Sequence, residues 1–379
     1  MSRLLPLVAE DMLTCMRFFG AGSLAISVIV ASCGGSTGPQ PTGGTTTSGK
    51  LVAKAVSANY MHTCALLTDG TVRCWGSYFC GPLNNGDTPS YTPVRISGVA
   101  NATAVSTGWD RMCVLLADKT VQCWGCYLAT VAGTQNSAPV TVSGITNAIA
   151  VAAGAQHACA LQADGTVHCW GGNFYGELGN GTTIDSAVPV TVSGISNATA
   201  ITDRCALLAG GTIQCWGGNA SGELGNGTTV NSSIPVSVSG ITNATAIAET
   251  CALLADGTVQ CWGNNLEGEL GNGTTTSSSV PVPVSGITNA TAVSNSCALL
   301  AGGTIQCWGN NLEGELGNGT TTSSSVPVPV SGITNATAVQ QTCAVLTGGT
   351  IQCWGGNAYG ELGNGTTTSS SVPVTVKGF

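Results

Sequence analysis

The stretch PVPVSGITNATAVSNSCALLAGGTIQCWG, residues 281–309, and the loop NNLEGELGNGTTTSSS that follows it, residues 310–325, decide the fold. The runs PVPV, ATAV, CALL and TIQCW are short, rich in Val, Ile, Thr and aromatic residues, and separated by Gly and Asn, which is typical of strands joined by turns. Gly302 and Gly303 separate the last two runs, and a Gly-Gly pair favours a tight hairpin because glycine adopts positive φ at little cost. One such unit therefore predicts four strands.

The same unit recurs throughout residues 51–379. Its most regular feature is a pair of cysteines with nine residues between them, followed by Trp-Gly, and this feature occurs seven times. From Cys113 onward the period is 46 residues, and the first step, from Cys64 to Cys113, is 49. Four strands in about 40–50 residues indicate a propeller blade rather than a helical repeat. We therefore predict an all-β fold, a seven-bladed β-propeller of four-stranded antiparallel blades.

The starting point of the repeat suggests how the ring closes. Runs of the PVPV type occur seven times, from Pro93 to Pro373, but the first run of the ATAV type, residues 52–57, has none before it. Unpaired sheet edges attract further strands. We therefore predict that the strand at Pro373 completes the blade that begins at Leu51, so that N- and C-terminal strands pair.

These units resemble the regulator-of-chromosome-condensation repeat family, whose repeats read A-G-x-x-H-x-x-A-L-x-x-D-G-x-V-x-x-W-G-x-N-x-x-G-x-L-G. Residues 153–161, AGAQHACAL, then Trp170 and Gly171, and then residues 176–179, GELG, follow this pattern almost throughout. The resemblance covers residues 51–379 and implies a seven-bladed propeller, here of a secreted, lipoprotein branch found in bacteria. It implies little about function, because one fold supports many functions.

The first 50 residues lie outside the repeats. Residues 18–32, FFGAGSLAISVIVAS, are apolar, too short to span a membrane comfortably, and followed by Cys33. Residues 1–33 therefore predict a secretory signal ending in a lipobox-like VASC, with Cys33 lipidated and Met16 the better start; an accidental apolar stretch is the alternative. Residues 34–50, rich in Gly, Ser, Thr and Pro, predict a flexible linker.

Composition restricts the partner and the location. Charged residues make up 7% of the chain, the net charge is −8, and no basic run occurs. This disfavours nucleic acid, since Lys and Arg must neutralise its phosphates. We expect a monomer, attached to the membrane only through its lipid, in the bacterial cell envelope at the outer membrane or cell surface; a secreted form is the alternative.

Cysteine usage suits an oxidising compartment. Without Cys15 and Cys33, 16 of the 18 cysteines remain. A three-residue loop such as 255–257 would place the two cysteines of a unit on one face of its hairpin. Free buried thiols and metal ligation are the alternatives, and the spacing argues against zinc. Cys80 and Cys126, in the long loops of the first two units, would bridge adjacent blades. The predicted hairpin disulfides join Cys64 with Cys74, Cys113 with Cys123, Cys159 with Cys169, Cys205 with Cys215, Cys251 with Cys261, Cys297 with Cys307 and Cys343 with Cys353.

Motifs of catalysis do not stand out. Residues 51–379 have no recurring His and acid pair, no nucleophile motif, no phosphate loop and no Asp-rich calcium loop. We therefore expect no enzyme, no cofactor and no metal site. His62 and His157 occupy the histidine position of the resembled repeat, which favours a structural role. The glutamates of the GELG motif would form a partial ring, and hydrogen bonding to the neighbouring loop is favoured over metal binding: Glu177, Glu223, Glu269, Glu315 and Glu361.

Nearly identical units differ mainly between the ATAV and CALL runs. There, units five to seven carry AET, SNS and QQT at residues 248–250, 294–296 and 340–342, and the first three units are four residues longer. Constant frameworks with varied tips are how rigid scaffolds present recognition surfaces; neutral drift is the alternative. The predicted partner-binding residues are Tyr60, His62, Trp109, Asp110, Arg111, His157, Asp203, Arg204 and Glu249.

These observations predict a surface-anchored binding module that recognises a protein or glycan through its tips. We expect replacement of Trp109 and Arg111 by Ala to leave the fold intact and weaken binding about tenfold or more. A secreted enzyme inhibitor is one alternative. An enzyme with a site in the central channel is another, which the Ala-, Val- and Ser-rich inner strands disfavour. Guanine-nucleotide exchange, the activity of the family's nuclear founder, is disfavoured by the signal and the cysteine pairs.

Overall fold

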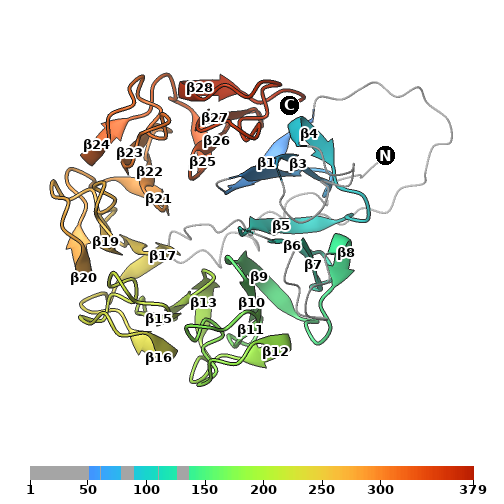
Figure 1. Ribbon diagram of the computed structural model, residues 1–379, viewed down its shortest axis with the longest axis vertical. Helices are drawn as coiled ribbons and strands as arrows, with labels where there is room; N and C mark the ends of the chain where they lie inside the picture. The colour runs from blue at the N-terminus through green and yellow to red at the C-terminus, as the bar shows by residue number, and fades with distance from the viewer. Residues whose placement is uncertain (1–50, 60, 78–88, 110, 126–135) are drawn as a thin grey trace, which may run out of the picture.

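The computed structural model describes residues 51–59, 61–77, 89–109, 111–125 and 136–379. Within these ranges the chain forms seven four-stranded antiparallel sheets around a central axis (Figure 1). The predicted all-β, seven-bladed propeller is confirmed. No helix in the described part of the chain is long and apolar enough to cross a membrane. The predicted signal, Cys33 and the linker lie outside the described residues.

Each blade contributes one strand to each of four positions, counted outward from the axis. The innermost strands are β1 (Ala53–Ala58), β5 (Ala102–Thr107), β9 (Ala148–Ala153), β13 (Ala198–Ile201), β17 (Ala244–Ala248), β21 (Ala290–Ser294) and β25 (Ala336–Gln340). The second strands are β2 (His62–Leu67), β6 (Arg111–Leu116), β10 (His157–Gln162), β14 (Cys205–Leu208), β18 (Cys251–Leu254), β22 (Cys297–Leu300) and β26 (Cys343–Leu346).

The two outer positions complete each blade. The third strands are β3 (Val72–Gly76), β7 (Val121–Gly125), β11 (Val167–Gly171), β15 (Ile213–Gly217), β19 (Val259–Gly263), β23 (Ile305–Gly309) and β27 (Ile351–Gly355). The outermost strands are β4 (Ser90–Arg95), β8 (Asn136–Thr141), β12 (Ser186–Thr191), β16 (Ser232–Ser237), β20 (Ser278–Pro283), β24 (Ser324–Pro329) and β28 (Ser370–Thr375).

The position of a strand in its blade explains its sequence. Second strands such as β18 and β22 are buried at every residue, because a neighbouring blade covers each face. This accounts for their continuous apolar run in place of an alternating pattern. Each outermost strand carries a central proline, for example Pro281 of β20. Proline has no backbone N–H to donate, so it hinders pairing of this open edge with another sheet.

Adjacent blades are joined by an apolar core and one recurring hydrogen bond. Between blades 6 and 7, the buried Trp354 of β27 packs with Leu316 of the preceding GELG loop. Its Nε1 donates to the backbone carbonyl of Glu315, at 2.8 Å. The Glu315 carboxylate instead accepts from the backbone N–H of Glu313 in its own loop, at 2.9 Å. The predicted hydrogen bonding of these glutamates to the neighbouring loop is wrong, because each carboxylate accepts from the backbone of its own loop.

A buried asparagine organises each GELG loop, and we did not predict it from the sequence. Asn311 Nδ2 donates to the carbonyls of Thr320 and Thr322, at 3.1 and 3.0 Å, and Oδ1 accepts from the Leu316 N–H at 2.8 Å. One side chain thus fixes three points of the loop. A signal was present, since units three to seven all read Trp-Gly-x-Asn at this place. Its equivalents are Asn173, Asn219, Asn265 and Asn357.

Disulfides cross the hairpins between second and third strands. In blade 5, Cys251 lies directly opposite Cys261, and residues 255–257 form the loop, with Gly257 at φ 80°. The predicted bulged turn therefore puts both cysteines on one face. Closing a loop of about ten residues stabilises the folded chain by about 3 kcal/mol.

All seven predicted pairings are present, one in each blade, and every cysteine in them is buried. The alternatives of free thiols and metal ligation are therefore wrong for these cysteines. The bonds indicate an oxidising compartment. They join Cys64 with Cys74, Cys113 with Cys123, Cys159 with Cys169, Cys205 with Cys215, Cys251 with Cys261, Cys297 with Cys307 and Cys343 with Cys353.

The predicted closure of the ring by terminal strand pairing is wrong. β28 pairs with β27 in the seventh sheet, and β4 completes the first. Each PVPV-type run therefore belongs to the blade before it, so the chain from Leu51 holds whole blades and leaves no strand to exchange. Side-by-side packing of blades 1 and 7 closes the circle instead: Ala53 N–H donates to Gly349 O at 3.1 Å, and Trp75 lies 6.0 Å from the Phe379 ring, centroid to centroid.

Candidate functional site

Two lengths of hairpin shape one face of the propeller. In blade 1 the pairing of β1 with β2 continues past Cys64 to Ala58 and Thr63, whereas in blade 5 it ends at Ala248 and Cys251. Blades 2 and 3 resemble blade 1, and blades 4, 6 and 7 resemble blade 5. The first-to-second-strand hairpins of blades 1–3 therefore extend further than those of blades 4–7.

These hairpin tips and the GELG loops lie on the same face. A Cβ built on Gly263, at the end of β19, would lie 3.5 Å from both Thr250 of the blade 5 tip and Glu223 of the preceding GELG loop. The shared-face prediction is confirmed for these elements. We call this surface the tip face and define it by residues 108–109, 154–156, 202–204, 249–250, 295–296 and 341–342.

Three of the predicted partner-binding residues are buried. His62 and Arg111 are 0% exposed and His157 is 4% exposed. The longer hairpins place them at the beginning of a second strand and not at a tip. Arg111 Nη2 donates to the carbonyl of Gln156 in blade 3, and His157 Nε2 bonds the carbonyl of Asp203 in blade 4 at 2.9 Å. Arg111 and His157 therefore connect neighbouring blades. Their burial contradicts the expectation that Arg111 could be removed without effect on the fold.

Trp109 differs from these neighbours. It lies in the hairpin tip between β5 and β6, and 64% of its surface is exposed. It also lines the central cavity of the propeller. Tyr60 and Asp110, predicted for the same tips, lie outside the described residues, as do Cys80 and Cys126.

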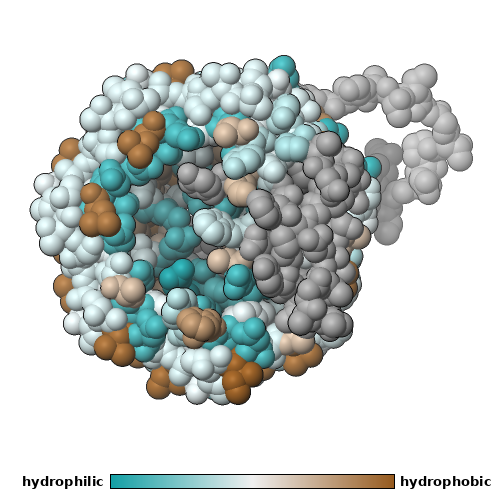
Figure 2. All heavy atoms as spheres, in the orientation of Figure 1, coloured by the Kyte–Doolittle hydropathy of each residue, from teal (hydrophilic) through white to brown (hydrophobic). Residues whose placement is uncertain are grey.

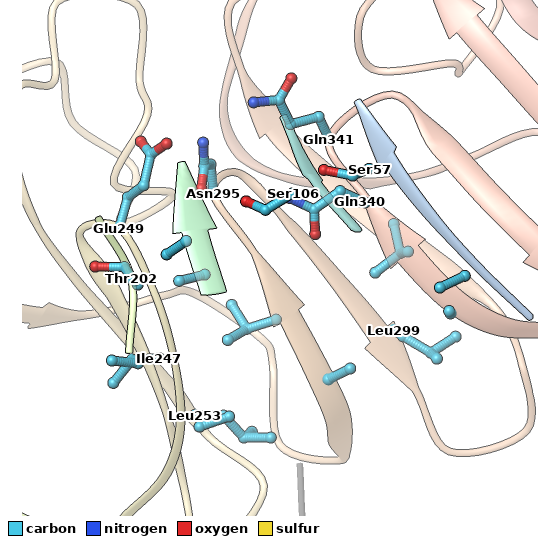
Figure 3. Close-up of a pocket in the computed structure, with 18 of the residues that line it drawn as sticks. Ser57, Ser106, Thr202, Ile247, Glu249, Leu253, Asn295, Leu299, Gln340 and Gln341 are labelled. Atoms are coloured by element: carbon cyan, nitrogen blue, oxygen red, sulfur yellow. The ribbon is translucent and has the colours of Figure 1, made fainter. Parts of the chain in front are cut away.

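A central cavity of about 1270 Å³ runs between the innermost strands. Figure 2 shows hydrophilic residues gathered around this hollow. Figure 3 shows Glu249, Asn295 and Gln341 toward one end of the cavity, with Leu253 and Leu299 toward the other. Because the tips of blades 4–7 are short, their polar residues surround the cavity mouth on the tip face.

Asp203 stands at the centre of the charged groups at this mouth. Its Oδ2 lies 3.7 Å from His157 Nε2 and 3.7 Å from Arg204 Nε. Burial lowers the pKa of His157 despite the nearby Asp203 carboxylate, so this imidazole is neutral at neutral pH. The Asp203 carboxylate raises the pKa of Arg204 further above its ordinary value. Arg204 therefore compensates the charge of Asp203.

Glu249 occupies the next tip and is exposed to the cavity. Its recessed position and the Asp203 carboxylate raise its pKa, while Arg204 and a hydrogen bond from the Asn295 amide act in the opposite direction. Since water reaches the side chain, its desolvation is weaker than in a closed core. Glu249 is thus a carboxylate whose hydrogen-bonding neighbour is a neutral amide.

The structure brings some of the predicted site residues together at the mouth of the cavity. Asp203, Arg204, Glu249 and Trp109 all line the central cavity. The inner strands are small and apolar along much of the wall, as expected. Polar side chains gather instead at the mouth, where the tips and Gln340, the last residue of β25, supply them. Asn295, Gln340 and Gln341 were noticed as varied tips but not predicted as site residues.

The described residues contain no group of three or more His, Cys, Asp or Glu side chains arranged to hold a metal ion. The polar residues at the mouth instead combine carboxylates, one guanidinium and several amides. Such groups recognise a ligand by hydrogen bonds and charge.

Solved structures with the same fold were found by comparison. Human WBSCR16 is 22% identical, with a TM-score of 0.68 over 81% of this chain and 94% of that chain. Prp20p from Saccharomyces cerevisiae, described with its binding properties to Gsp1p and histones, is 20% identical, with a TM-score of 0.62 over 73% and 76%. Yeast Prp20 bound by Kap60 is 19% identical, with a TM-score of 0.61 over 73% of this chain and 74% of that chain. No curated protein sequence matches.

Family comparison agrees with the resemblance seen in the repeats. The regulator of chromosome condensation (RCC1) repeat matches residues 164–206, 210–251, 256–298, 303–345 and 349–379, together more than half of the chain. A second description of this repeat matches residues 53–81 and 148–177. The chain therefore belongs to the regulator of chromosome condensation (RCC1) repeat family.

Proposed function

We propose that this protein is a binding module that recognises a partner protein on its tip face. The observation that carries the proposal is the contrast between framework and tips. Residues 251–293 and 297–339 differ at only two positions, 256/302 and 259/305, yet the three residues that follow them are SNS and QQT. Of those residues, Asn295, Gln340 and Gln341 line the mouth of the central cavity.

Rigidity of the framework supports this proposal. Each hairpin between a second and a third strand carries a disulfide, and each GELG loop of blades 3–7 is fixed by a buried asparagine. Inner-strand serines of blades 1, 2 and 6 also bond the next blade. Ser294 Oγ, for example, accepts from the Gln341 N–H at 2.8 Å. A rigid scaffold lets a few exposed side chains bind without a large loss of conformational entropy.

Exposed aromatic residues also suit a partner-binding face. Trp109 is 64% exposed at the cavity, and Phe174 and Tyr175, on the GELG loop of blade 3, are 78% and 50% exposed. Their rings are in edge contact, with centroids 4.7 Å apart. Aromatic side chains supply large contact areas at low entropic cost and are frequent at binding hot spots. Yeast Prp20p, which shares the fold, is described as binding proteins, and this is consistent with a protein partner here.

We also propose that the protein is displayed at the cell envelope through a lipid on Cys33. The apolar run at residues 18–32 and the following cysteine support this, and the seven disulfides are consistent with export. Metabolic labelling with a radioactive fatty acid tests it. Label on the wild-type chain that Cys33→Ala removes supports the anchor, and label that persists in Cys33→Ala contradicts it.

The recognition function is tested by capture from the surface and secreted fractions of the native organism, using the immobilised full-length chain. We expect Trp109→Ala to reduce the affinity for the captured protein about tenfold or more. The matched control is Val188→Ala, since Val188 is 60% exposed on the outermost strand of blade 3 and is not among the residues that define the tip face. Equal capture by both variants would contradict the proposal. A captured hydrolase that loses activity on binding would identify the module as an inhibitor, and a glycan in place of a protein would refute a protein partner.

A further inference from the structure

We propose that the mouth of the central cavity binds a cationic side chain, Lys or Arg, presented by the partner protein. The inference rests on the proposed binding function and specifies the chemistry of the same face. The site is made by Glu249 and Asn295, with Asp203 beside them and Trp109 on the wall formed by blade 2.

The charges at the mouth favour a cation. Asp203 and Glu249 are carboxylates. Among the described residues, Arg204 is the cationic side chain at the cavity mouth, and its Nε lies 3.7 Å from Asp203 Oδ2. Arg204 also interacts with Glu249, and with Glu223 and Glu177 of the nearby GELG loops, so one positive charge faces four carboxylates. This sector of the tip face therefore carries excess negative charge, and an incoming ammonium or guanidinium group would meet a favourable potential.

Glu249 is the carboxylate best suited to bind it. The Asn295 amide bonds the Glu249 carboxylate, yet the side chain remains exposed to the cavity. A carboxylate can accept several hydrogen bonds at once, so an ammonium or a guanidinium can bind without displacing Asn295. Its recessed position, followed by the neighbouring Asp203 carboxylate, raises the pKa of Glu249, and a bound cation would offset the repulsion from Asp203 and lower that pKa again.

Trp109 is a second, independent feature that points to a cation. Its ring is exposed and lines the same cavity from blade 2, on the far side of the ring from blade 5. The face of an indole attracts Lys and Arg side chains more strongly than other aromatic rings do. A basic segment that crosses the mouth would therefore find a cation-binding group at each side.

The loops around the cavity mouth also carry exposed negative and apolar side chains. Leu266 and Leu312 are 73% and 71% exposed, and each is followed by an exposed glutamate, Glu267 or Glu313. Glu267 accepts from the Ser323 hydroxyl of the next blade at 3.1 Å, so its loop rests on that neighbour. These pairs offer apolar contact beside negative charge, which suits a partner segment in which basic and apolar residues alternate.

The same charges disfavour other occupants. A second copy of this chain would bring a like-charged face against it, and nucleic acid or an anionic membrane would be repelled. A basic protein segment is therefore the occupant that the surface complements.

The test uses full-length protein and two labelled peptides, one of alternating arginine and leucine and one with glutamate in place of arginine. Fluorescence anisotropy should show that the arginine peptide binds more tightly than the glutamate peptide and that added salt weakens it. Glu249→Gln should lower the affinity for the arginine peptide about tenfold or more, since a charge-assisted hydrogen bond is lost. The control variant Asp118→Asn neutralises a carboxylate at the β6–β7 hairpin on the opposite face, and it should leave the affinity for the arginine peptide unchanged.

A second variant tests the proposal even if Glu249→Gln fails to fold. Asn295→Asp adds a carboxylate beside Glu249 and should tighten binding of the arginine peptide. Equal affinity of Glu249→Gln and Asp118→Asn, or equal binding of the two peptides by wild type, would overturn the proposal. If the captured partner is lost on Trp109→Ala but unaffected by Glu249→Gln and by salt, the binding function stands and the cation site is refuted.

Discussion

The indole Nε1 of Trp75, in blade 1, donates a hydrogen bond of 2.7 Å to the backbone carbonyl of Glu361, in blade 7. The two residues are 286 positions apart, so this bond lies where the ring closes. The Thr63 hydroxyl donates to the same carbonyl at 3.1 Å. The junction of the first and last blades thus repeats the Trp-to-Glu contact found between Trp354 and Glu315.

Trp75→Phe removes this hydrogen bond and should lower the free energy of unfolding by about 0.5–1.5 kcal/mol, the net contribution of one hydrogen bond, because the Thr63 hydroxyl still donates to the same carbonyl. Trp170→Phe is the matched control. Trp170 is also buried, but its Nε1 has no hydrogen-bond partner in the described part of the structure. Denaturant unfolding of both variants should show the larger loss for Trp75→Phe. An equal loss would mean that ring volume, and not the hydrogen bond, stabilises the closure.

Replacement of both Cys251 and Cys261 by Ala should lower the free energy of unfolding by about 3 kcal/mol, the value expected for a closed loop of this length. The two residues are 10 apart in sequence and bonded in the structure. Denaturant unfolding measures the loss, and peptide mapping under non-reducing conditions checks the pairing. Recovery of Cys251 as a free thiol from the oxidised wild-type protein would contradict the assignment.

Asn311→Ala should destabilise the protein by roughly 2–3 kcal/mol, because the N–H of Leu316 and the carbonyls of Thr320 and Thr322 lose their partner inside the protein. Asn310→Ala is the control, since Asn310 is only partly buried and its Nδ2 bonds a side chain, Glu315, at 3.1 Å. Thermal unfolding should give a clearly lower Tm for Asn311→Ala. Similar Tm values for the two variants would show that this asparagine does not organise the loop.

The stability of the protein should fall as the pH is lowered from about 6.5 toward 4, partly because of His62. Burial lowers the pKa of His62 from 6.5 to about 4. Between these values the unfolded chain binds a proton that the folded chain does not, so acid favours unfolding by about 3 kcal/mol at most. The raised pKa values of Glu249 and Glu361 act in the opposite direction, since protonation of these groups favours the folded state.

The difference between wild type and His62→Gln isolates this contribution. Unfolding free energies measured at pH 7 and pH 4.5 should drop more for wild type than for the variant. Identical drops would show that His62 is protonated without cost in the folded protein.

The blades could be predicted from sequence because each strand has a local signature. The Gly302-Gly303 type of turn, the CALL run and the spacing of Cys297 and Cys307 all depend on residues near one another. The point at which each blade begins and ends could not be predicted, since a PVPV run can pair with the strand before it or with the strand after it. The three-dimensional pairing, with Cys353 opposite Val374, shows that β28 belongs to blade 7.

The candidate site was predictable in position but not in orientation. Divergent tips identified Asp203, Arg204 and Glu249, which do lie at the cavity mouth. Arg111 and His157 have similar chemistry, yet they are buried because the longer hairpins place them within paired strands. Whether a polar side chain points to a neighbouring blade or to the cavity depends on hairpin length in three dimensions, which residue type does not reveal.

Recognition by the divergent tips is tested most directly by making the tips of blades 5 and 7 identical to that of blade 6, with residues 248–250 and 340–342 changed to Ser-Asn-Ser. Because blade 6 already carries this tip on almost the same framework, the variant should unfold at a Tm close to that of wild type. The affinity for the captured partner should fall by about tenfold or more. Unchanged affinity in a folded variant would show that the tips have merely drifted and that the partner binds elsewhere.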